Sequence, residues 1–345
     1  MHISDFDYEL PEELIAQHPL ATRAASRMLV VDRVNHTWSE SEFVRLPEYL
    51  KPGDALVLNN TRVFPARLRG RRVPSGGTVE LMLIREVDSN VWEALTRPAR
   101  RLQNGALLEF NDSRLKAQVV ESLDQGIRLI KFECEQSLDQ FIDELGETPL
   151  PPYIKRARDA DVDDRERYQT VYASKRGAIA APTAGLHFTP ELLGELKSRG
   201  IAVAEITLHV GYGTFEPVRV GDISQHRVAP EWSAISKEAA RAINAIRPQG
   251  GRVVAVGTTT TRALESSVTP TGQTGSSSGF ANLTIVPGYT FRAVDALLTN
   301  FHLPRSSLLM LVSAFAGRDL ILDAYRYAVK EGYRFYSYGD CMLIL

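Results

Sequence analysis

The stretch "ARLRGRRVPSGGTVELMLIREV", Ala66 to Val87, decides the fold, because apolar and polar residues alternate with a period of two on both sides of the turn "PSGG". The pattern continues to Glu133 in "VWEALTRP", "ALLEF", "LKAQVVESL" and "IRLIKFE", which are separated by "DSN", "QNG", "NDS" and "DQG". Short half-buried strands at such close spacing predict a small antiparallel barrel or sandwich.

The sequence on either side of this region has a different character. Apolar runs rich in β-branched residues, typical of strands buried on both faces, are "ALVLNNTRV", "GAIAAP", "IAVAEITLHV" and "GRVVAVG". Helical spacing is found in "PEELIAQ", "TPELLGELKSRG" and "SKEAARAINAIRPQG". Because such segments occur before and after the β region, we predict the α/β class: a discontinuous α/β domain, residues 1–64 and 150–345, with a small antiparallel β-barrel domain, residues 65–149, inserted.

Two further segments are interpreted as connections. The proline-rich "TPLPPYIKR" should form a stiff return from the inserted domain. The Gly/Ser/Thr-rich "TPTGQTGSSSGF", Thr269 to Phe280, is typical of a mobile loop.

Composition narrows the function classes. The chain has 345 residues, 44% of them hydrophobic, and a net charge of −2. Its longest strongly apolar run, Leu308 to Ala316, is far shorter than the ~20 residues that span a bilayer, and acids stand where a signal peptide carries bases. Cys134 and Cys341 cannot form a disulfide framework. We expect a soluble, cytoplasmic, monomeric protein that does not contact a membrane.

Basic residues are concentrated in one part of this weakly acidic protein. This basic region runs from Arg62 to Lys116, and the arginines at the start of the region are Arg62, Arg67, Arg69, Arg71 and Arg72. Such a patch could bind phosphates. An ordinary solvated basic surface is the alternative.

Polar loops follow several predicted strands. Thr183, Gly185 and His187 precede a helix that should begin at Thr189 and Pro190. The strand ending in Gly257 is followed by four hydroxyl residues, Thr258 to Thr261, and then by Arg262. Strand ends of this kind are where open α/β sheets bind ligands, although a capped helix beside a structural histidine would look similar.

Three other segments carry candidate binding groups. In "GYGTF" two glycines flank Tyr212, beside Phe215. In "TNFHLPRSSLLMLVSAFAG", Asn300, His302, Arg305 and Ser306 run into an apolar helix, and we expect Pro304 in its first turn. Near the end of the chain, Asp340 precedes an apolar strand.

Familiar chemical motifs are absent from the sequence. The seven histidines show neither HxxxH nor HxH spacing, so no metal site is expected. No dinucleotide or P-loop fingerprint occurs, and neither a GxSxG elbow nor an evident cysteine nucleophile is present. The residues alone therefore leave the chemistry open.

Long blocks of the sequence nevertheless resemble one family, the S-adenosylmethionine:tRNA ribosyltransferase-isomerases of the queuosine pathway. They include "FDYELPEELIAQHPL", "GDALVLNNTRVFPARLRG", "PLPPYIKR", "GAIAAPTAGLHFT", "ITLHVGYGTFEPV", "VGTTTTRALES", "PGYTFRAVDALLTNFHLPRSSLLMLVSAFAG" and "YRFYSYGDCMLIL". The blocks lie in order along essentially the whole chain. One departure is that the family usually shows H-x-M-H-x-E where this chain has "HRVAPE", with Val228 and Ala229 in place of the Met and the second His.

The resemblance implies that the chain transfers and isomerises the ribosyl part of S-adenosylmethionine onto 7-aminomethyl-7-deazaguanine at the wobble position of tRNA. Epoxyqueuosine-tRNA would form, and adenine and methionine would leave. It also implies an α/β domain carrying an inserted β-barrel, and no cofactor or metal beyond S-adenosylmethionine as co-substrate. The alternatives are an S-adenosylmethionine-dependent tRNA methyltransferase and a non-catalytic RNA-binding protein.

The matching blocks also supply candidate site residues. Titratable groups that could act as acid or base are His187, His302, His209, Glu231 and Asp340. We favour His187 or His302, whose pKa a following helix start would lower. Substrate-binding candidates are Thr183, Gly185, Tyr212, Phe215, Thr258, Thr259, Arg262, Asn300, Phe301, Arg305 and Ser306. Candidates for tRNA contacts are Arg62, Arg67, Arg69, Arg71 and Arg72.

Overall fold

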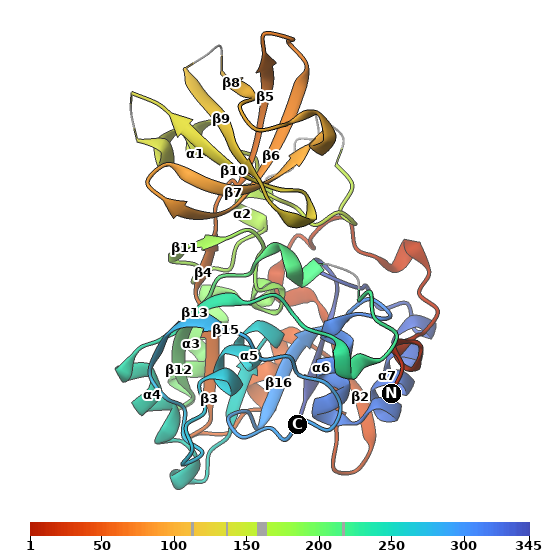
Figure 1. The fold of residues 1–345 in the computed structure, drawn as a ribbon. Coiled ribbons are helices and arrows are strands. Elements are labelled where there is room, and N and C mark those ends of the chain that lie inside the picture. The colour runs from red at the N-terminus through yellow and green to blue at the C-terminus, as the bar shows by residue number, and fades with distance from the viewer. Residues whose placement is uncertain (112–113, 136, 157–163, 216–217) are drawn as a thin grey trace.

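The computed structural model describes residues 1–111, 114–135, 137–156, 164–215 and 218–345, with backbone only at Gln125, Thr214 and Phe215. It confirms the predicted fold class, since a mixed α/β part carries a closed antiparallel barrel (Figure 1). The two domain boundaries remain predictions.

A nine-stranded sheet forms the centre of the α/β part, in the order β15-β13-β12-β3-β14-β16-β17-β1-β2. Its central four strands are mutually parallel: β12 (Ala202–Leu208), β3 (Ala55–Asn59), β14 (Val253–Val256) and β16 (Ala296–Asn300). On one side lie β17 (Cys341–Ile344), antiparallel to β16, then β1 (Arg27–Asp32) and β2 (Thr37–Glu42). On the other side lie β13 (Glu231–Ile235) and β15 (Ser277–Ala281), both antiparallel to their neighbours.

This topology brings several loops to one edge of the sheet. The carboxyl ends of the four parallel strands lie there, together with the amino ends of β17 and β1, because β17 runs antiparallel to β16 and β1 runs parallel to β17. Open α/β sheets bind their ligands outside the carboxyl ends of parallel strands.

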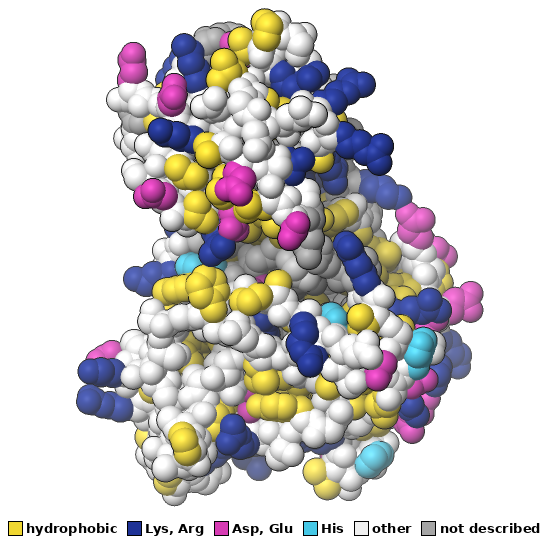
Figure 2. Space-filling view, in the orientation of Figure 1, with side chains coloured by type: hydrophobic (Ala, Val, Ile, Leu, Met, Phe, Trp, Pro, Cys, Tyr) yellow, Lys and Arg dark blue, Asp and Glu magenta, His cyan; other side chains and the backbone are white. Residues whose placement is uncertain are grey.

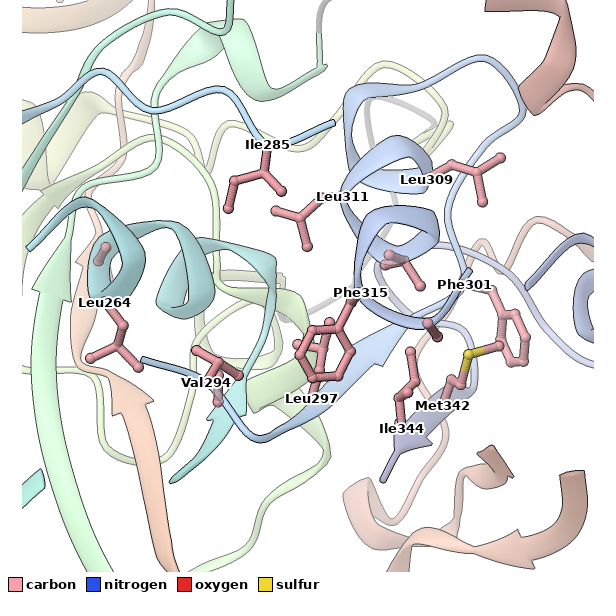
Figure 3. Packing of buried hydrophobic residues seen from close by; sticks show 14 of the residues in the cluster. Leu264, Ile285, Val294, Leu297, Phe301, Leu309, Leu311, Phe315, Met342 and Ile344 are labelled. Atoms are coloured by element: carbon pink, nitrogen blue, oxygen red, sulfur yellow. The ribbon is translucent and has the colours of Figure 1, made fainter. Parts of the chain in front are cut away.

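Helices cover both faces of the sheet. On one face lie α4 (Lys237–Asn244), α5 (Thr258–Ser266), α6 (Ser307–Ala316) and α7 (Arg318–Lys330), and on the other lies α3 (Pro190–Ser198). Figure 3 shows the packing on the face covered by α5 and α6, where Leu264 of α5, Leu311 and Phe315 of α6 and Leu297 of β16 belong to one buried cluster. Strands β3, β14 and β16 are buried along their whole length, as their mainly apolar sequences predict, whereas β12 exposes Ala202 and Glu205.

The barrel has its own core and contains six strands in the closed order β10-β7-β6-β5-β8-β9. The strands are β5 (Arg67–Val73), β6 (Thr78–Asp88), β7 (Val91–Arg97), β8 (Leu107–Phe110), β9 (Leu115–Ser122) and β10 (Ile127–Glu133), and α1 (Leu138–Leu145) packs beside them. The predicted alternation is observed, because Leu68, Leu81 and Leu83 are buried while the residues on either side of each are less buried. Closure pairs every strand edge.

The barrel is attached at the sheet edge where the loops meet. The chain leaves β3 through β4 (Thr61–Val63), forms the barrel, and returns through α2 (Asp164–Arg167) and β11 (Lys175–Ala178). Strands β4 and β11 pair in parallel. The barrel therefore lies beyond the carboxyl end of β3 (Figure 1).

Three local predictions were wrong. "PEELIAQ" forms only the 3-10 turn Glu12–Leu14, too short for a helix. The predicted loop 269–280 includes part of β15, because its residues pair with β13 at the sheet edge. Helix α6 begins at Ser307 with Ser306 as its N-cap, so Pro304 precedes the helix. No helix in the described ranges is long and apolar enough to cross a bilayer.

Candidate active site

A pocket of about 490 Å³ opens at the loop-bearing edge of the sheet. It is lined by segments that follow β11, β12, β14 and β16 or precede β17: Ala181–Ala184, Val210, Gly257–Thr259, Thr299–His302, Tyr336 and Ser337, with Tyr153 and Leu308 completing the wall. Five predicted binding residues and one predicted base line this pocket: Thr183, Thr258, Thr259, Asn300, Phe301 and His302.

His302 is a neutral imidazole in this wall. Its Nε2 lies 2.9 Å from Oγ1 of Thr299, whose hydroxyl is 3.4 Å from the carbonyl oxygen of Asn300. If that hydroxyl donates to the carbonyl, Nε2 carries the proton and Nδ1 keeps its lone pair. Nδ1 has no hydrogen-bond partner among the described residues. Burial lowers the pKa of His302 to about 3, so the ring is neutral at neutral pH.

The main chain of His302 is also fixed. Its N–H donates to the Tyr325 hydroxyl at 3.1 Å, and its carbonyl accepts a hydrogen bond from the Tyr8 hydroxyl. The ring is therefore presented from a rigid backbone, which favours a defined catalytic geometry.

His187 lies on the other side of Asn300 and is engaged at both ring nitrogens. Asn300 donates from Nδ2 to the Tyr336 carbonyl at 2.8 Å, which turns its Oδ1 toward Nε2 of His187 at 3.2 Å. Because Oδ1 only accepts, Nε2 carries the proton, and Nδ1 accepts from the Ser26 hydroxyl at 2.8 Å. Burial, together with the charges of Arg23 and Arg334, lowers the pKa of His187 to about 4. His187 therefore positions Asn300, and His302 is the better candidate for the base.

The four consecutive threonines have different roles. Thr260 and Thr261 donate their hydroxyls to the carbonyls of Val256 and Gly257, at 2.6 and 3.1 Å. Thr258 and Thr259 remain in the pocket wall, at the amino end of the nine-residue helix α5. Their hydroxyls and the positive helix end are suited to an electron-rich or anionic group.

Arg262 and Glu231 form a buried clamp beside the pocket. Arg262 donates to Oε2 of Glu231 at 2.7 Å and to the carbonyls of Ala229, Ala281 and Leu283 at 2.6 to 2.9 Å. Glu231 also accepts the Gly211 N–H at 2.8 Å. Both residues line an adjoining cavity of about 420 Å³. Because the guanidinium is already paired with Glu231, we interpret Arg262 as a structural clamp, and the ligand-binding role predicted for it stays a prediction.

The other two predicted acid/base groups lie outside the pocket. His209 stacks on Trp232, with ring centroids 5.0 Å apart, and its Nδ1 is 2.8 Å from the Thr61 hydroxyl. Asp340 is buried and accepts the main-chain N–H groups of Arg27 and Arg334, at 2.9 and 2.8 Å. Burial raises the pKa of Asp340. Its contacts tie the loop before β17 to β1, which is a structural role.

Three predicted substrate-binding residues, Gly185, Arg305 and Ser306, are placed elsewhere, and Phe301 borders the pocket without offering its ring to a ligand. Phe301 is fully buried among Tyr325, Tyr333 and Phe335, so its ring faces are not available for stacking on a ligand. Gly185 packs directly against the Tyr172 hydroxyl, and Arg305 pairs with Asp7 at the surface. The Ser306 hydroxyl caps α6 by accepting the Leu309 N–H at 3.2 Å.

The aromatic loop remains a candidate in part. Tyr212 lies in the 3-10 turn Tyr212–Phe215 and is 40% exposed, so it could meet a ligand. The predicted contact by the Phe215 side chain falls outside the described part of the structure.

Comparison with known proteins decides the family. The model of the family described as queuosine biosynthesis protein matches residues 3–344. The chain belongs to the queuosine biosynthesis protein family. A curated relative from Desulforamulus reducens, an S-adenosylmethionine:tRNA ribosyltransferase-isomerase, is 48% identical over 345 residues, which span both chains completely. The crystal structure of S-adenosylmethionine tRNA ribosyltransferase from Thermotoga maritima is 40% identical, with a TM-score of 0.57 over 99% of this chain and 100% of that one.

This queuosine biosynthesis protein departs from the expected family pattern at Val228 and Ala229, and the structure shows what the segment does. The Val228 N–H donates to the Thr284 hydroxyl at 3.0 Å, and the Ala229 carbonyl accepts from Arg262. Both contacts use the main chain, so they do not depend on the side chains that differ.

Two of the five arginines predicted to bind RNA in this queuosine biosynthesis protein lie close to carboxylates. Arg67, Arg69 and Arg71 alternate along β5 and project outward, but Arg67 lies 3.8 Å from Glu80 and Arg69 lies 3.0 Å from Glu147. Arg62, Arg71 and Arg72 form no ion pair with any described carboxylate. Figure 2 shows Lys and Arg side chains gathered on one side of the barrel.

Sequence reasoning missed several pocket residues of this family member: Tyr153, Thr299, Tyr336 and Ser337. Tyr153 comes from the proline-rich return and hydrogen-bonds to the Ser337 hydroxyl. The quoted blocks contain all four, but no local pattern marks them, since the pocket depends on contacts between distant segments. Within the described ranges, no group of three or more His, Cys, Asp or Glu side chains could hold a metal ion.

Proposed function

We propose that this chain transfers and isomerises the ribosyl moiety of S-adenosylmethionine to 7-aminomethyl-7-deazaguanine at the wobble position of tRNA, giving epoxyqueuosine-tRNA, adenine and methionine. The observation that carries the proposal is the 48% identity, over both full lengths, to an S-adenosylmethionine:tRNA ribosyltransferase-isomerase. The pocket at the sheet edge, beside the attached barrel, supports it.

The pocket offers groups suited to the first step. The sulfonium acidifies the neighbouring 5′ carbon of the ribose, and a neutral base that removes this proton can start the elimination of adenine. His302 is the candidate, because it is neutral, rigidly held and lines the pocket. Its Nδ1 would take the proton. The electron pair of the broken C–H bond would form a C4′–C5′ double bond as the ring C4′–O bond breaks, and the freed oxygen would form the C1′ carbonyl as the bond from C1′ to adenine breaks.

Other groups would hold the reactants. The hydroxyls of Thr258 and Thr259 are placed to bind ribose hydroxyls or the departing adenine, next to the positive end of α5. Asn300 is locked between His187 and the Tyr336 carbonyl, and so shapes the wall. The substrate amine then attacks the opened ribosyl carbon chain, and closure of the epoxide expels methionine.

The RNA would be held across both domains. Unpaired arginines near the barrel, Arg62, Arg71 and Arg72, are candidates for phosphate contacts while the modified base enters the pocket. We infer that the protein works in the cytoplasm, where tRNA is modified, as a monomer, and needs S-adenosylmethionine but no separate cofactor or metal.

Product analysis tests the proposal. The protein is incubated with S-adenosylmethionine and tRNA carrying the aminomethyl base, and nucleosides and small molecules are measured by mass spectrometry. Adenine and methionine should appear in equal amounts with the modified tRNA nucleoside. S-adenosylhomocysteine with methylated tRNA would instead identify a methyltransferase, and RNA binding without consumption of S-adenosylmethionine would identify a non-catalytic binding protein.

A further inference from the structure

A second pocket, of about 290 Å³, lies beside the first and is lined by two arginines. Arg23 and Arg167 form its charged wall, and Ser26, His187 and the segment Ser337–Gly339 contribute further lining. None of the candidate RNA contacts from the sequence lies here, and the proposed first step does not use the pocket.

Both arginines are held in place by carbonyl groups rather than by carboxylates. Arg23 donates to the carbonyls of Leu186 and Glu166, at 3.1 and 3.0 Å. Arg167 donates to the carbonyls of Ala21, at 3.3 Å, and Leu20. Neither guanidinium forms an ion pair with a carboxylate of the described residues. These contacts fix the orientation of two cations without neutralising them.

The acidic groups near the pocket do not neutralise its two arginines. Asp164 binds Arg156 through both carboxylate oxygens, at 2.6 and 3.0 Å, and accepts the Tyr338 hydroxyl at 2.8 Å. Burial and repulsion from Arg167 lower the pKa of Arg23. Glu166 is exposed, and its attraction for Arg23 raises that pKa by less than burial and Arg167 lower it. Two half-buried like charges side by side favour an anionic ligand.

The wall between the two pockets is thin. Ser337 lines both of them, and the other side of the wall is His187, whose Nε2 is 3.2 Å from Oδ1 of Asn300 in the first pocket. A base and the phosphate of its own nucleotide are separated by one sugar. An RNA nucleotide could therefore place its base in the first pocket and a flanking phosphate in the second.

We propose that the Arg23–Arg167 pocket binds a backbone phosphate flanking the modified nucleotide of the RNA substrate, and so sets how deeply its base enters the first pocket. This inference rests on the proposed function. Two fixed cations match the two free oxygens of a phosphodiester or of the methionyl carboxylate. We favour the phosphodiester because only one sugar separates it from a base in the adjoining first pocket. The carboxylate is kept as an outcome of the test.

Binding of each ligand alone separates these possibilities. The RNA probe is an anticodon stem-loop carrying the aminomethyl base, measured by fluorescence anisotropy, and S-adenosylmethionine is measured by calorimetry. Arg167→Gln should raise the Kd for the RNA about tenfold and lower the slope of log Kd against log salt by about 0.7, with the Kd for S-adenosylmethionine unchanged. Arg199→Gln is the matched control, because Arg199 pairs with Glu195 at the opposite edge of the sheet.

A chemical change in the RNA tests the contact itself. Replacing one flanking phosphate by a neutral methylphosphonate should weaken binding to the wild-type protein about as much as Arg167→Gln does, and combining the two changes should add little. Additive losses at both flanking phosphates would overturn the proposal. So would a raised Kd for S-adenosylmethionine with unchanged RNA binding, which would assign the pocket to the methionyl carboxylate.

Two further measurements keep the test independent of folding and of the reaction. Arg167→Lys retains the charge and should recover most of the RNA affinity, while thermal unfolding verifies that each variant is folded. If wild-type protein bound the RNA as described but released no adenine, the proposed function would fail while the phosphate contact stood. Wild-type activity with no specific effect of Arg167→Gln would reject the phosphate contact alone.

Discussion

Removing Arg262 should cost far more stability than removing an exposed arginine. The side chains of Arg262 and Glu231 are only 7% and 4% exposed, and the guanidinium makes four hydrogen bonds, one to Glu231 and three to carbonyl groups. The change Arg262→Gln leaves Glu231 buried beside a neutral group and can replace at most part of the carbonyl contacts. It therefore tests whether Arg262 is a structural clamp or a ligand-binding residue.

The size of the effect follows from these contacts. Breaking a buried ion pair by removing one partner costs about 3–5 kcal/mol. Each carbonyl that loses its donor adds about 1 kcal/mol, but these losses overlap, and glutamine restores some of them. We expect Arg262→Gln to lower the free energy of unfolding by about 4 kcal/mol. The exposed pair of Arg199 and Glu195 should be worth less than about 1 kcal/mol, so Arg199→Gln is the control.

Urea unfolding followed by circular dichroism measures these differences, and calorimetry measures S-adenosylmethionine binding to the folded variants. The double change Arg262→Met with Glu231→Leu should recover a large part of the lost stability, because it removes the uncompensated buried charge. A loss below about 1 kcal/mol for Arg262→Gln, together with a tenfold weaker affinity for S-adenosylmethionine, would refute the clamp and return Arg262 to the ligand-binding groups.

Three other predictions concern the catalytic and RNA-binding residues. His302→Asn should slow adenine release in a single turnover by at least about 100-fold, and a larger loss for His187→Asn would reverse the assigned roles. Burial lowers the pKa values of His302 and His187 to about 3 and about 4, so the unfolded state binds more protons than the folded state below pH ~6.5. The free energy of unfolding should therefore fall as the pH drops from ~6.5 toward 4. His302→Asn should make this fall less steep, which urea unfolding at a series of pH values would detect. Arg71→Glu should weaken RNA binding, measured by anisotropy at two salt concentrations, more than Arg69→Glu does, because Arg69 is already paired with Glu147; equal losses would contradict this ranking.

Local patterns in the sequence predicted the architecture well because each element carries its own periodicity. The alternation in "ARLRGRRV" and its neighbours specifies strands with one buried face, and those strands form the barrel. The cap at Thr189 with Pro190 behind it correctly marked the start of α3. One error occurred where pairing decides structure: residues 277–280 look like a loop but become an edge strand because β13 offers a partner.

The site was predicted only in part, because its geometry comes from distant contacts. Asn300, His302, Thr258 and Thr259 lie at strand ends, where topology places ligands, and they do meet in one pocket. The sequence could not show that Glu231 neutralises Arg262 or that Tyr153 meets Ser337, since neither pair is close along the chain. Nor could it distinguish His187, held at both nitrogens, from His302, held at one.

The fate of isotopes in S-adenosylmethionine tests the proposed reaction most directly. Two preparations are used with the same tRNA, one labelled with carbon-13 in the ribosyl group and one in the methyl group, and the nucleosides of the digested tRNA are analysed by mass spectrometry. Ribosyl transfer predicts that the ribosyl label enters the modified nucleoside while the methyl label leaves in methionine. Methyl label in the RNA, with the ribosyl label retained in S-adenosylhomocysteine, would contradict it.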